Sequence, residues 1–210
     1  MSLPDAPSAI ILAAGRSRRM GERNKLFLTV DGRPVLLRVL QAVAAAPVKE
    51  MIVVTGAQHE RIAGLVRRAD GARVVHNPDF RSGMSSSIRR GVRAASPDAT
   101  GFAMCPGDLP LLSSSIVDRL CQSFAAQTTP RIVAPTYDGQ QGHPVIFGAS
   151  YREALLDLEG DRGARDLLRS DEVPLTRVPV HDNSILQDVD TPEALAKVRQ
   201  QVSQKEGENR

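Results

Sequence analysis

The sequence is poor in the residues that mark several classes of protein. Its 210 residues include two cysteines, Cys105 and Cys121, which excludes a disulfide framework and offers no familiar metal-ligand spacing. We expect both to be reduced thiols that are partly buried. Tryptophan is absent, aromatic residues make up 3 %, and no block of Lys or Arg accompanies the formal net charge of +3. Stacking platforms and a basic stripe are therefore missing, and we expect no nucleic-acid partner.

Long apolar runs are also missing. The longest run covers residues 9–14, which is too short to cross a bilayer, and no basic leader or cleavage-like segment precedes it. We therefore expect a cytoplasmic protein with no membrane partner. Lysine is scarce too, with Lys25, Lys49, Lys197 and Lys205 among 27 basic residues, which we interpret as a compositional bias towards arginine.

What the chain does contain is a regular alternation of strand-like and helix-like patterns. Short apolar runs predict strands at residues 9–13, 51–54, 74–75, 102–104 and 132–134. Apolar residues at helical spacing predict helices at residues 34–45, 60–68, 85–95 and 115–125. This alternation predicts a three-layer α/β fold, in which a mainly parallel sheet has helices on both faces.

The pattern is less regular in the second half of the chain. We expect a turn at residues 137–141, extended segments at 144–147 and 173–180, short helices at 152–158 and 164–168, and a last strand at 185–186. Thr191 and Pro192 predict the start of a helix that ends near residue 202. No repeat or linker divides the chain. We therefore expect one domain over residues 1–210, with a core at about 8–200 and a frayed polar tail at 203–210.

The loop after the first predicted strand has the composition of an anion site. Small residues, two glycines and four basic residues follow one another there: Leu12, Ala13, Ala14, Gly15, Arg16, Ser17, Arg18, Arg19, Met20, Gly21 and then Lys25. Small residues let backbone N–H groups approach an anion, and Arg and Lys neutralise it. The loop has neither the Gly-Lys-Ser/Thr of a P-loop nor the Gly-x-Gly-x-x-Gly of dinucleotide sites. We interpret it as a triphosphate site; the alternative is an ordinary glycine turn with solvated arginines.

Three aspartates form a candidate metal site. Asp108 lies between Pro106 and Pro110 after the fourth predicted strand, at the sheet edge where α/β folds bind ligands. A carboxylate held there suits Mg²⁺, with a turn or a helix cap as the alternative. Asp188 and Asp190 alternate along an extended segment and therefore point to one side. Helix capping is again the alternative, but Asp108 alone would leave Mg²⁺ under-liganded. We expect at least one of the pair, with Asp190 favoured, to complete the site.

A serine-rich segment follows the third predicted strand. Asn77 and Pro78 end that strand, and residues 82–87 lead into a helix. Free backbone N–H groups at the helix start, together with the serine hydroxyls, are suited to hold a base or a phosphate. The alternative is a serine-rich helix cap.

These motifs resemble those of the MobA/MocA-type molybdenum cofactor nucleotidyltransferases, over about residues 8–200. The first loop resembles the signature Leu-Ala-Ala-Gly-x-Ser-x-Arg-Met-Gly…Lys, and its Ala-Ala-Gly resembles the cytidylyltransferase branch. Three residues separate Gly21 from Lys25, where many cytidylyltransferases have two. Residues 105–110 resemble Cys-Pro-x-Asp-Gln-Pro, with Leu109 in place of the common Gln. If that Gln recognises the substrate, Leu109 changes the substrate.

Four later segments extend the resemblance. Residues 83–88 resemble Gly-Met-x-x-Ser-Ile/Leu, which lies near the nucleotide in the family, and residues 188–193 resemble Asp-x-Asp-Thr-Pro-Glu, which helps to hold the metal. Residues 142–144 resemble Gly-His-Pro and residues 160–165 resemble Gly-Asp-x-Gly-Ala-Arg, both on the side of the second substrate. In the last motif Arg165 is suited to bind the substrate phosphate, while for Asp161 helix capping is the alternative.

The resemblance implies a Rossmann-like fold of the nucleotide-diphospho-sugar transferase type. It implies transfer of CMP from CTP to the terminal phosphate of molybdopterin or molybdenum cofactor, with Mg²⁺, or alternatively Mn²⁺, as the cofactor and a molybdenum hydroxylase as the receiver of the product. The implied site residues are catalytic Arg19, Lys25 and Asp108; nucleotide-binding Leu12, Ala13, Ala14, Gly15, Arg16, Ser17, Lys25, Gly83 and Ser87; substrate-binding His143 and Arg165; and metal-binding Asp108, Asp188 and Asp190.

Other interpretations stay open from the sequence. The base could be guanine, with GTP as the donor, and the acceptor could be another phosphomonoester, such as an isoprenoid or sugar precursor. A non-catalytic carrier of nucleotide or cofactor is the alternative from another class. A carrier would not need Lys25 together with three metal-binding carboxylates, and this argues for an enzyme.

Overall fold

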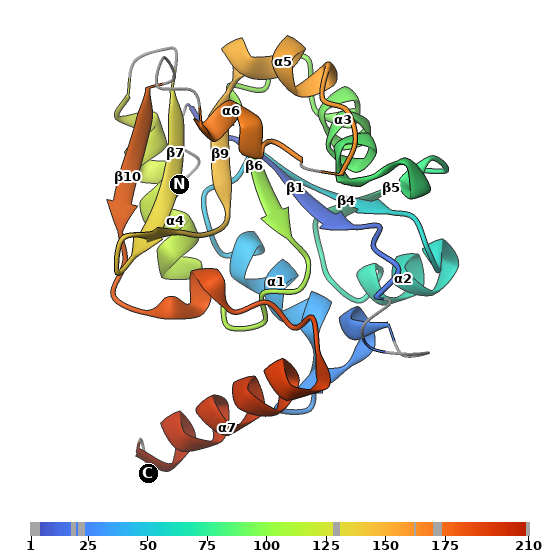
Figure 1. The fold of residues 1–210 in the computed structure, drawn as a ribbon, viewed down its shortest axis with the longest axis vertical. Coiled ribbons are helices and arrows are strands. Elements are labelled where there is room, and N and C mark those ends of the chain that lie inside the picture. Colours follow the sequence, from blue (N-terminus) through green and yellow to red (C-terminus); the bar gives the residue numbers. More distant parts are fainter. Residues whose placement is uncertain are drawn as a thin grey trace.

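The computed structural model describes residues 5–17, 20, 24–127, 131–161, 163–169 and 174–208. Its centre is an eight-stranded sheet, in which seven strands lie in the order β10-β7-β9-β6-β1-β4-β5 and β8 pairs with β7 (Figure 1). The strands are β1 (Ser8–Ala13), β4 (Glu50–Thr55), β5 (Ala72–His76), β6 (Gly101–Pro106), β7 (Ile132–Tyr137), β8 (Gln140–Gln141), β9 (Val145–Gly148) and β10 (Leu175–Pro179).

The first strand lies near the middle of the sheet. β1 pairs in parallel with β4 on one side and with β6 on the other, so the chain builds outward from β1 to β5 and then returns to add β6. β9 enters antiparallel between β6 and β7, and β10 pairs in parallel with β7. The strands predicted from short apolar runs are confirmed, with their ends extended by up to three residues.

Helices cover both faces of this sheet. On one face α1 (Val35–Ala44), α2 (His59–Val66) and α4 (Ser114–Ala125) pack against alternate residues of β1 such as Ile11. On the other face α3 (Met84–Ala94) and α5 (Arg152–Leu156) pack against residues such as Ile10, and leucines of α6 (Arg165–Arg169) join them. Since successive side chains of a β-strand point to opposite faces, a single strand contributes side chains to both cores. The predicted three-layer α/β fold is confirmed.

Two predictions near the C-terminus are wrong. The predicted strand at residues 185–186 lies in a 3₁₀ helix, η5 (Asn183–Leu186). The Asp182 carboxylate accepts a hydrogen bond from the Ser184 N–H at 2.9 Å, which starts a helical turn, and Ile185 is buried from that turn. The last helix, α7 (Pro192–Glu208), continues beyond residue 202. Residues 203–206 are Ser, Gln, Lys and Glu; Gln, Lys and Glu have good helix propensity, but the segment has no apolar residue that would mark a helix.

A small hairpin that the sequence did not predict anchors α7. It consists of β2 (Thr29–Val30) and β3 (Arg33–Pro34) and follows the 3₁₀ helix η2 (Lys25–Phe27). A separate apolar cluster joins the hairpin region to α7 through Val30, Val35, Val189, Leu195 and Val198. Beyond this cluster α7 projects from the body of the molecule (Figure 1).

Both cysteines are more deeply buried than expected. Cys105 and Cys121 are free thiols, 1 % and 0 % exposed. Burial raises the pKa of each thiol to about 12, so both are neutral at physiological pH. Within the described ranges, no helix combines the length and the apolar character needed to cross a membrane.

Candidate active site

A cavity of about 840 Å³ opens where the loops after β1 and β6 meet. Strand order reverses between these two strands, and in open α/β sheets this is the position where ligands bind. Thirteen of the predicted site residues line the cavity: Leu12, Ala13, Ala14, Gly15, Arg16, Ser17, Lys25, Gly83, Ser87, Asp108, His143, Arg165 and Asp190. Arg19, predicted to be catalytic, lies outside the described residues.

The first loop is closed on itself by polar contacts. Ser17 has a φ of 49° and its hydroxyl accepts the Lys25 N–H at 3.3 Å, so the two ends of the loop meet. Asn24 caps η2 by accepting the Leu26 N–H at 3.0 Å. A Cβ built on Gly15 would meet no atom within 4 Å, so the backbone here is open to a ligand. The loop therefore has the form expected of a phosphate cradle.

Three carboxylates converge beside this loop. One oxygen from each of Asp108, Asp188 and Asp190 lies within 4.8 Å of the others. The Val189 N–H donates to the Asp108 carbonyl at 3.0 Å, and the Val189 side chain is fully buried. Because neighbouring residues of an extended segment point to opposite sides, burial of Val189 turns Asp188 and Asp190 towards Asp108.

Lys25 joins the loop to the carboxylates. Its ammonium group forms ion pairs with Asp108 and Asp190. Burial by itself lowers the pKa of Lys25, but the charges and hydrogen bonds of the two carboxylates outweigh it and raise the pKa, so the ammonium is charged. The pKa of Asp188 is raised by burial and by the negative charges of Asp108 and Asp190, against the opposing charge of Lys25.

This donor set fits a divalent cation. Hard carboxylate oxygens are the ligands that Mg²⁺ and Mn²⁺ prefer. Three carboxylates against one ammonium leave two formal negative charges, which match a doubly charged ion. Asp108, Asp188 and Asp190 would hold such an ion.

His143 and Arg165 also line the cavity. The backbone N–H of His143 donates to the Ile185 carbonyl at 3.1 Å, which fixes the backbone at this position. The side chain of His143 remains accessible from the cavity. Desolvation by burial lowers the pKa of His143, and the positive charge of Arg165 lowers it further. The negative charge of Asp108 acts in the opposite direction and raises this pKa. A neutral imidazole and an exposed guanidinium therefore face the carboxylates, a pairing suited to a phosphate group.

The start of α3 is occupied by groups of the protein itself, which favours the helix cap over anion binding, the two interpretations left open from the sequence. The Met84 N–H donates to the Asp161 carboxylate at 2.9 Å, and the Ser85 N–H donates to the Gly160 carbonyl at 3.2 Å. Gly83 has a φ of 110°, and a Cβ there would lie 2.4 Å from the Gly160 oxygen. Loop 159–161 therefore occupies this helix terminus, and Asp161 caps α3.

Two residues near the nucleotide segment were not assigned from the sequence. Asn77 is 2 % exposed, and its amide donates to the hydroxyls of Ser86 at 2.9 Å and Ser87 at 3.0 Å, so it orients both serines. Phe80 lines the cavity and is partly exposed. A polar residue directly after a predicted strand and ahead of a serine-rich helix is the signal that would have found Asn77.

Leu109 does not take part in the cavity. It is 2 % exposed and belongs to the core on the α1 and α4 side of the sheet. In this chain the side chain at position 109 packs inside the protein and is not exposed to the cavity.

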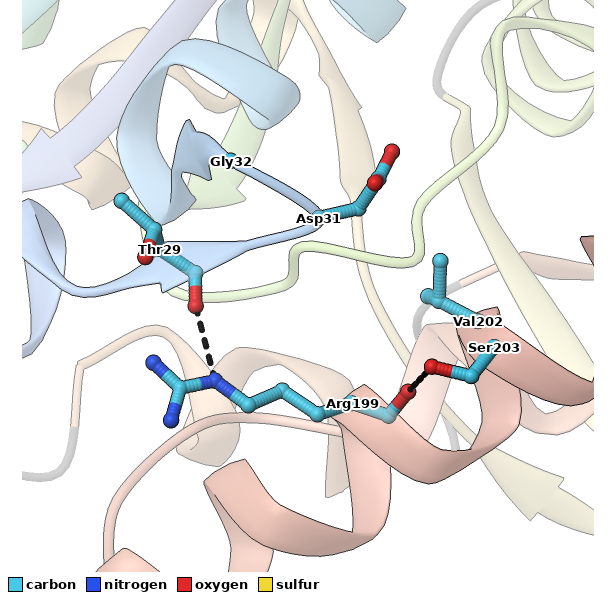
Figure 2. Close-up of a pocket in the computed structure, with 6 residues that line it drawn as sticks. All are labelled: Thr29, Asp31, Gly32, Arg199, Val202 and Ser203. Atoms are coloured by element: carbon cyan, nitrogen blue, oxygen red, sulfur yellow. Dashed lines mark hydrogen bonds between the residues drawn. The ribbon is translucent and has the colours of Figure 1, made fainter.

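A second, smaller cavity of about 300 Å³ lies between the hairpin and α7 (Figure 2). Here Arg199 Nε donates to the Thr29 carbonyl at 2.9 Å, and Ser203 Oγ donates to the Arg199 carbonyl at 3.1 Å. The Asp31 carboxylate points away from Arg199 in this view. The guanidinium thus already serves a structural contact, and this cavity has neither the glycine loop nor the carboxylates of the larger one.

The arrangement of glycine loop, lysine and carboxylates can now be compared with known proteins. The model of the MobA-like NTP transferase domain matches residues 9–176. The chain belongs to the MobA-like NTP transferase family. As a member of this family it is a nucleotidyltransferase, as predicted.

Two curated relatives match this chain, and each match covers nearly the full length of both proteins. Nicotine blue oxidoreductase from Paenarthrobacter nicotinovorans is 28 % identical over 202 residues, covering 91 % of this chain and 95 % of the relative. The purine catabolism protein PucB from Bacillus subtilis is 30 % identical over 208 residues, covering 92 % and 96 %.

Solved structures of similar sequence share the MobA-like fold. A nucleotidyl transferase from Methanothermobacter superimposes with a TM-score of 0.83 at 25 % identity, covering 96 % of this chain and 99 % of that one. A Mycobacterium tuberculosis protein solved with manganese superimposes with a TM-score of 0.75 at 26 % identity, covering 93 % and 98 %.

Proposed function

We propose that this nucleotidyltransferase transfers CMP from CTP to the terminal phosphate of molybdopterin or molybdenum cofactor and releases pyrophosphate. The observation that carries the proposal is that Lys25 joins the glycine loop to Asp108 and Asp190, two carboxylates of the triad, within one cavity. Nucleotidyl transfer needs a triphosphate held against a divalent cation, and this arrangement supplies both sites.

The first loop would hold the triphosphate. Residues 13–17 line the cavity, Arg16 among them is exposed, and Lys25 lies at the end of the loop beside Asp108 and Asp190. We propose that Lys25 and Arg19 neutralise the negative charge that builds up on the phosphates as pyrophosphate leaves. Such charge neutralisation in a preorganised site is a large part of catalysis in phosphate chemistry.

Asp108, Asp188 and Asp190 would hold the divalent cation. When bound, the cation supplies charge neutralisation at the α-phosphate. The tie between the Val189 N–H and the Asp108 carbonyl keeps the carboxylates together before any ligand arrives. The relative solved with manganese supports a divalent cation for this fold, and we propose Mg²⁺ as the ion here, with Mn²⁺ as a substitute.

His143 and Arg165 would receive the acceptor phosphomonoester. Such a phosphate is largely a dianion at neutral pH, because its second pKa is about 6, so it needs no strong general base. Its oxygen forms a new bond to the α-phosphorus while the bond from that phosphorus to the bridging oxygen of the β-phosphate breaks. The bonding electrons leave with pyrophosphate, and Arg165 with neutral His143 holds the acceptor in line.

The choice of CTP and of a molybdopterin acceptor rests on the resemblance of Ala13-Ala14-Gly15 and of the later motifs to the cytidylyltransferase branch. We propose that the enzyme acts in the cytoplasm and passes its product to a molybdenum hydroxylase. A guanylyltransferase, or an enzyme for another phosphomonoester, is the alternative that the assay below distinguishes.

The test measures pyrophosphate release from each of the four ribonucleoside triphosphates, with Mg²⁺ or Mn²⁺ and molybdopterin. The proposal expects release with CTP that depends on molybdopterin. Asp108→Asn should fold and lose turnover, and Lys25→Ala should lose at least about tenfold, equivalent to about 1.4 kcal/mol of transition-state stabilisation. Turnover with GTP alone would assign the guanylyl branch. Full turnover by Asp108→Asn would overturn the metal assignment.

A further inference from the structure

We infer that Phe80 is the apolar platform on which the base of the bound nucleotide stacks, which makes it a base-binding residue that contributes affinity for the nucleotide. This inference rests on the proposed function. Phe80 begins the 3₁₀ helix η3 (Phe80–Ser82), in the loop between β5 and α3, and it lines the same cavity as the phosphate loop.

The ring is positioned at the strand end of the phosphate loop. A Cβ built on Gly56 would lie 2.5 Å from the Phe80 Cβ and 2.9 Å from the Ala14 Cβ. Phe80 and Ala14 therefore both pack against Gly56. Lys25 and the carboxylates mark the end of the loop that would hold the reacting phosphates. A nucleotide whose phosphates lie there would extend its base towards Ala14 and Phe80.

The segment that carries Phe80 is held rigidly. The Asp79 N–H donates to the Asn77 side-chain oxygen at 3.0 Å, and the Asp79 carbonyl accepts the Ser82 N–H at 2.9 Å and the Ser86 hydroxyl at 3.0 Å. Asn77, which is buried, also orients Ser87. The ring and the Ser87 hydroxyl therefore belong to one preorganised unit, so little conformational entropy is lost when a base binds.

Phe80 is also the phenylalanine with accessible surface among those that line this cavity. Two phenylalanines line it, and Phe147 is 1 % exposed because it belongs to the core, whereas Phe80 is only partly buried. The neighbouring Arg81 lines the cavity as well, with its guanidinium carbon 5.8 Å from the centre of the Phe80 ring. Stacking on such rings is tolerant of base identity and depends on an exposed π-face.

The test compares binding of CTP with binding of tripolyphosphate, which has no base, to the full chain in Mg²⁺ by calorimetry. Phe80→Leu keeps apolar contact with Ala14 and removes the ring; Phe80→Tyr keeps the ring. We expect Phe80→Leu to weaken CTP binding at least about fivefold, equivalent to about 1 kcal/mol, and to leave tripolyphosphate binding unchanged. Phe80→Tyr should bind CTP like the original protein.

Two results would overturn the inference while leaving the proposed function standing. One is unchanged CTP binding by Phe80→Leu. The other is an equal loss for CTP and tripolyphosphate, which would assign Phe80 to the support of the phosphate loop. Failure of the original protein to bind any ribonucleoside triphosphate would instead remove the proposed function, and this inference with it. The unfolding midpoint of each ligand-free variant confirms that it is folded.

Discussion

The ion pairs of Lys25 predict that this lysine and a divalent cation compete for the same carboxylates. In the ligand-free protein the Lys25 ammonium contacts Asp108 and Asp190, two of the three groups that would bind the cation. Replacing Lys25 with Met removes the positive charge and keeps an unbranched side chain of similar length. Cation binding in the absence of nucleotide should therefore become tighter, although turnover falls.

The size of this effect follows from the geometry of the site. At 4.8 Å, the span of the carboxylates, a single and a double positive charge repel by about 1.7 kcal/mol at the dielectric constant of water and by about 7 kcal/mol at an effective value of about 20. The smaller figure applies if the flexible four-carbon stem of Lys25 lets its ammonium turn towards water when a cation enters. We expect Lys25→Met to bind Mn²⁺ at least about tenfold more tightly.

The assay is titration with Mn²⁺, followed by electron paramagnetic resonance of the free ion. Lys49→Met is the matched control, because Lys49 pairs with the exposed Asp98 at 2.6 Å on the surface. This control removes the same charge and should leave Mn²⁺ affinity unchanged. If Lys25→Met bound Mn²⁺ no more tightly than the original protein, or if Lys49→Met gained as much, direct competition would be refuted.

Three further predictions concern stability. Gly83→Ala should lower the unfolding midpoint by several degrees, since it combines a positive φ with a contact to the Gly160 oxygen, a strain of about 1–3 kcal/mol. Asp161→Ala removes the cap of α3 and should cost about 1 kcal/mol, whereas the exposed Asp157→Ala should be neutral in the same melting assay. For Glu50, burial raises the pKa, but hydrogen bonds and an arginine outweigh it and lower the pKa below 4.5. Its stabilisation should be complete above pH 4.5 and lost as pH falls through the lowered pKa, so denaturant melts of Glu50→Gln and the original protein should converge in acid.

The parts of the fold that the sequence predicts well are those in which apolar residues are contiguous and deeply buried. β1 and β4 are continuous apolar runs because helices cover both of their sides, and such runs are readable without knowledge of their partners. The hairpin β2–β3 contains two-residue strands, too short for any periodicity. The final helix was underestimated because its residues after Val202 are polar or glycine, so no apolar pattern marks its length.

The candidate site shows the same division. Composition alone indicated the glycine loop, and alternation alone indicated that Asp188 and Asp190 share a side. The occupied start of α3 was not predictable, because the groups that fill it, Gly160 and Asp161, lie more than seventy residues away along the chain. The contact of Lys25 with Asp108 and Asp190 likewise joins segments distant in sequence, and only folding brings them together.

The anchoring of Val189 makes the site dependent on the order of synthesis. Residues 188–190 are held by the Val189 N–H at Asp108 and by a cluster in which Val189 packs with Leu195 and Val198 of α7. The central strands and their helices can pack as soon as they leave the ribosome, because their contacts lie earlier in the chain. The carboxylate triad, however, cannot form until the first turns of α7 have emerged. A nascent chain can therefore carry a nearly complete sheet and phosphate loop while two of its three metal-binding carboxylates have still to take their places.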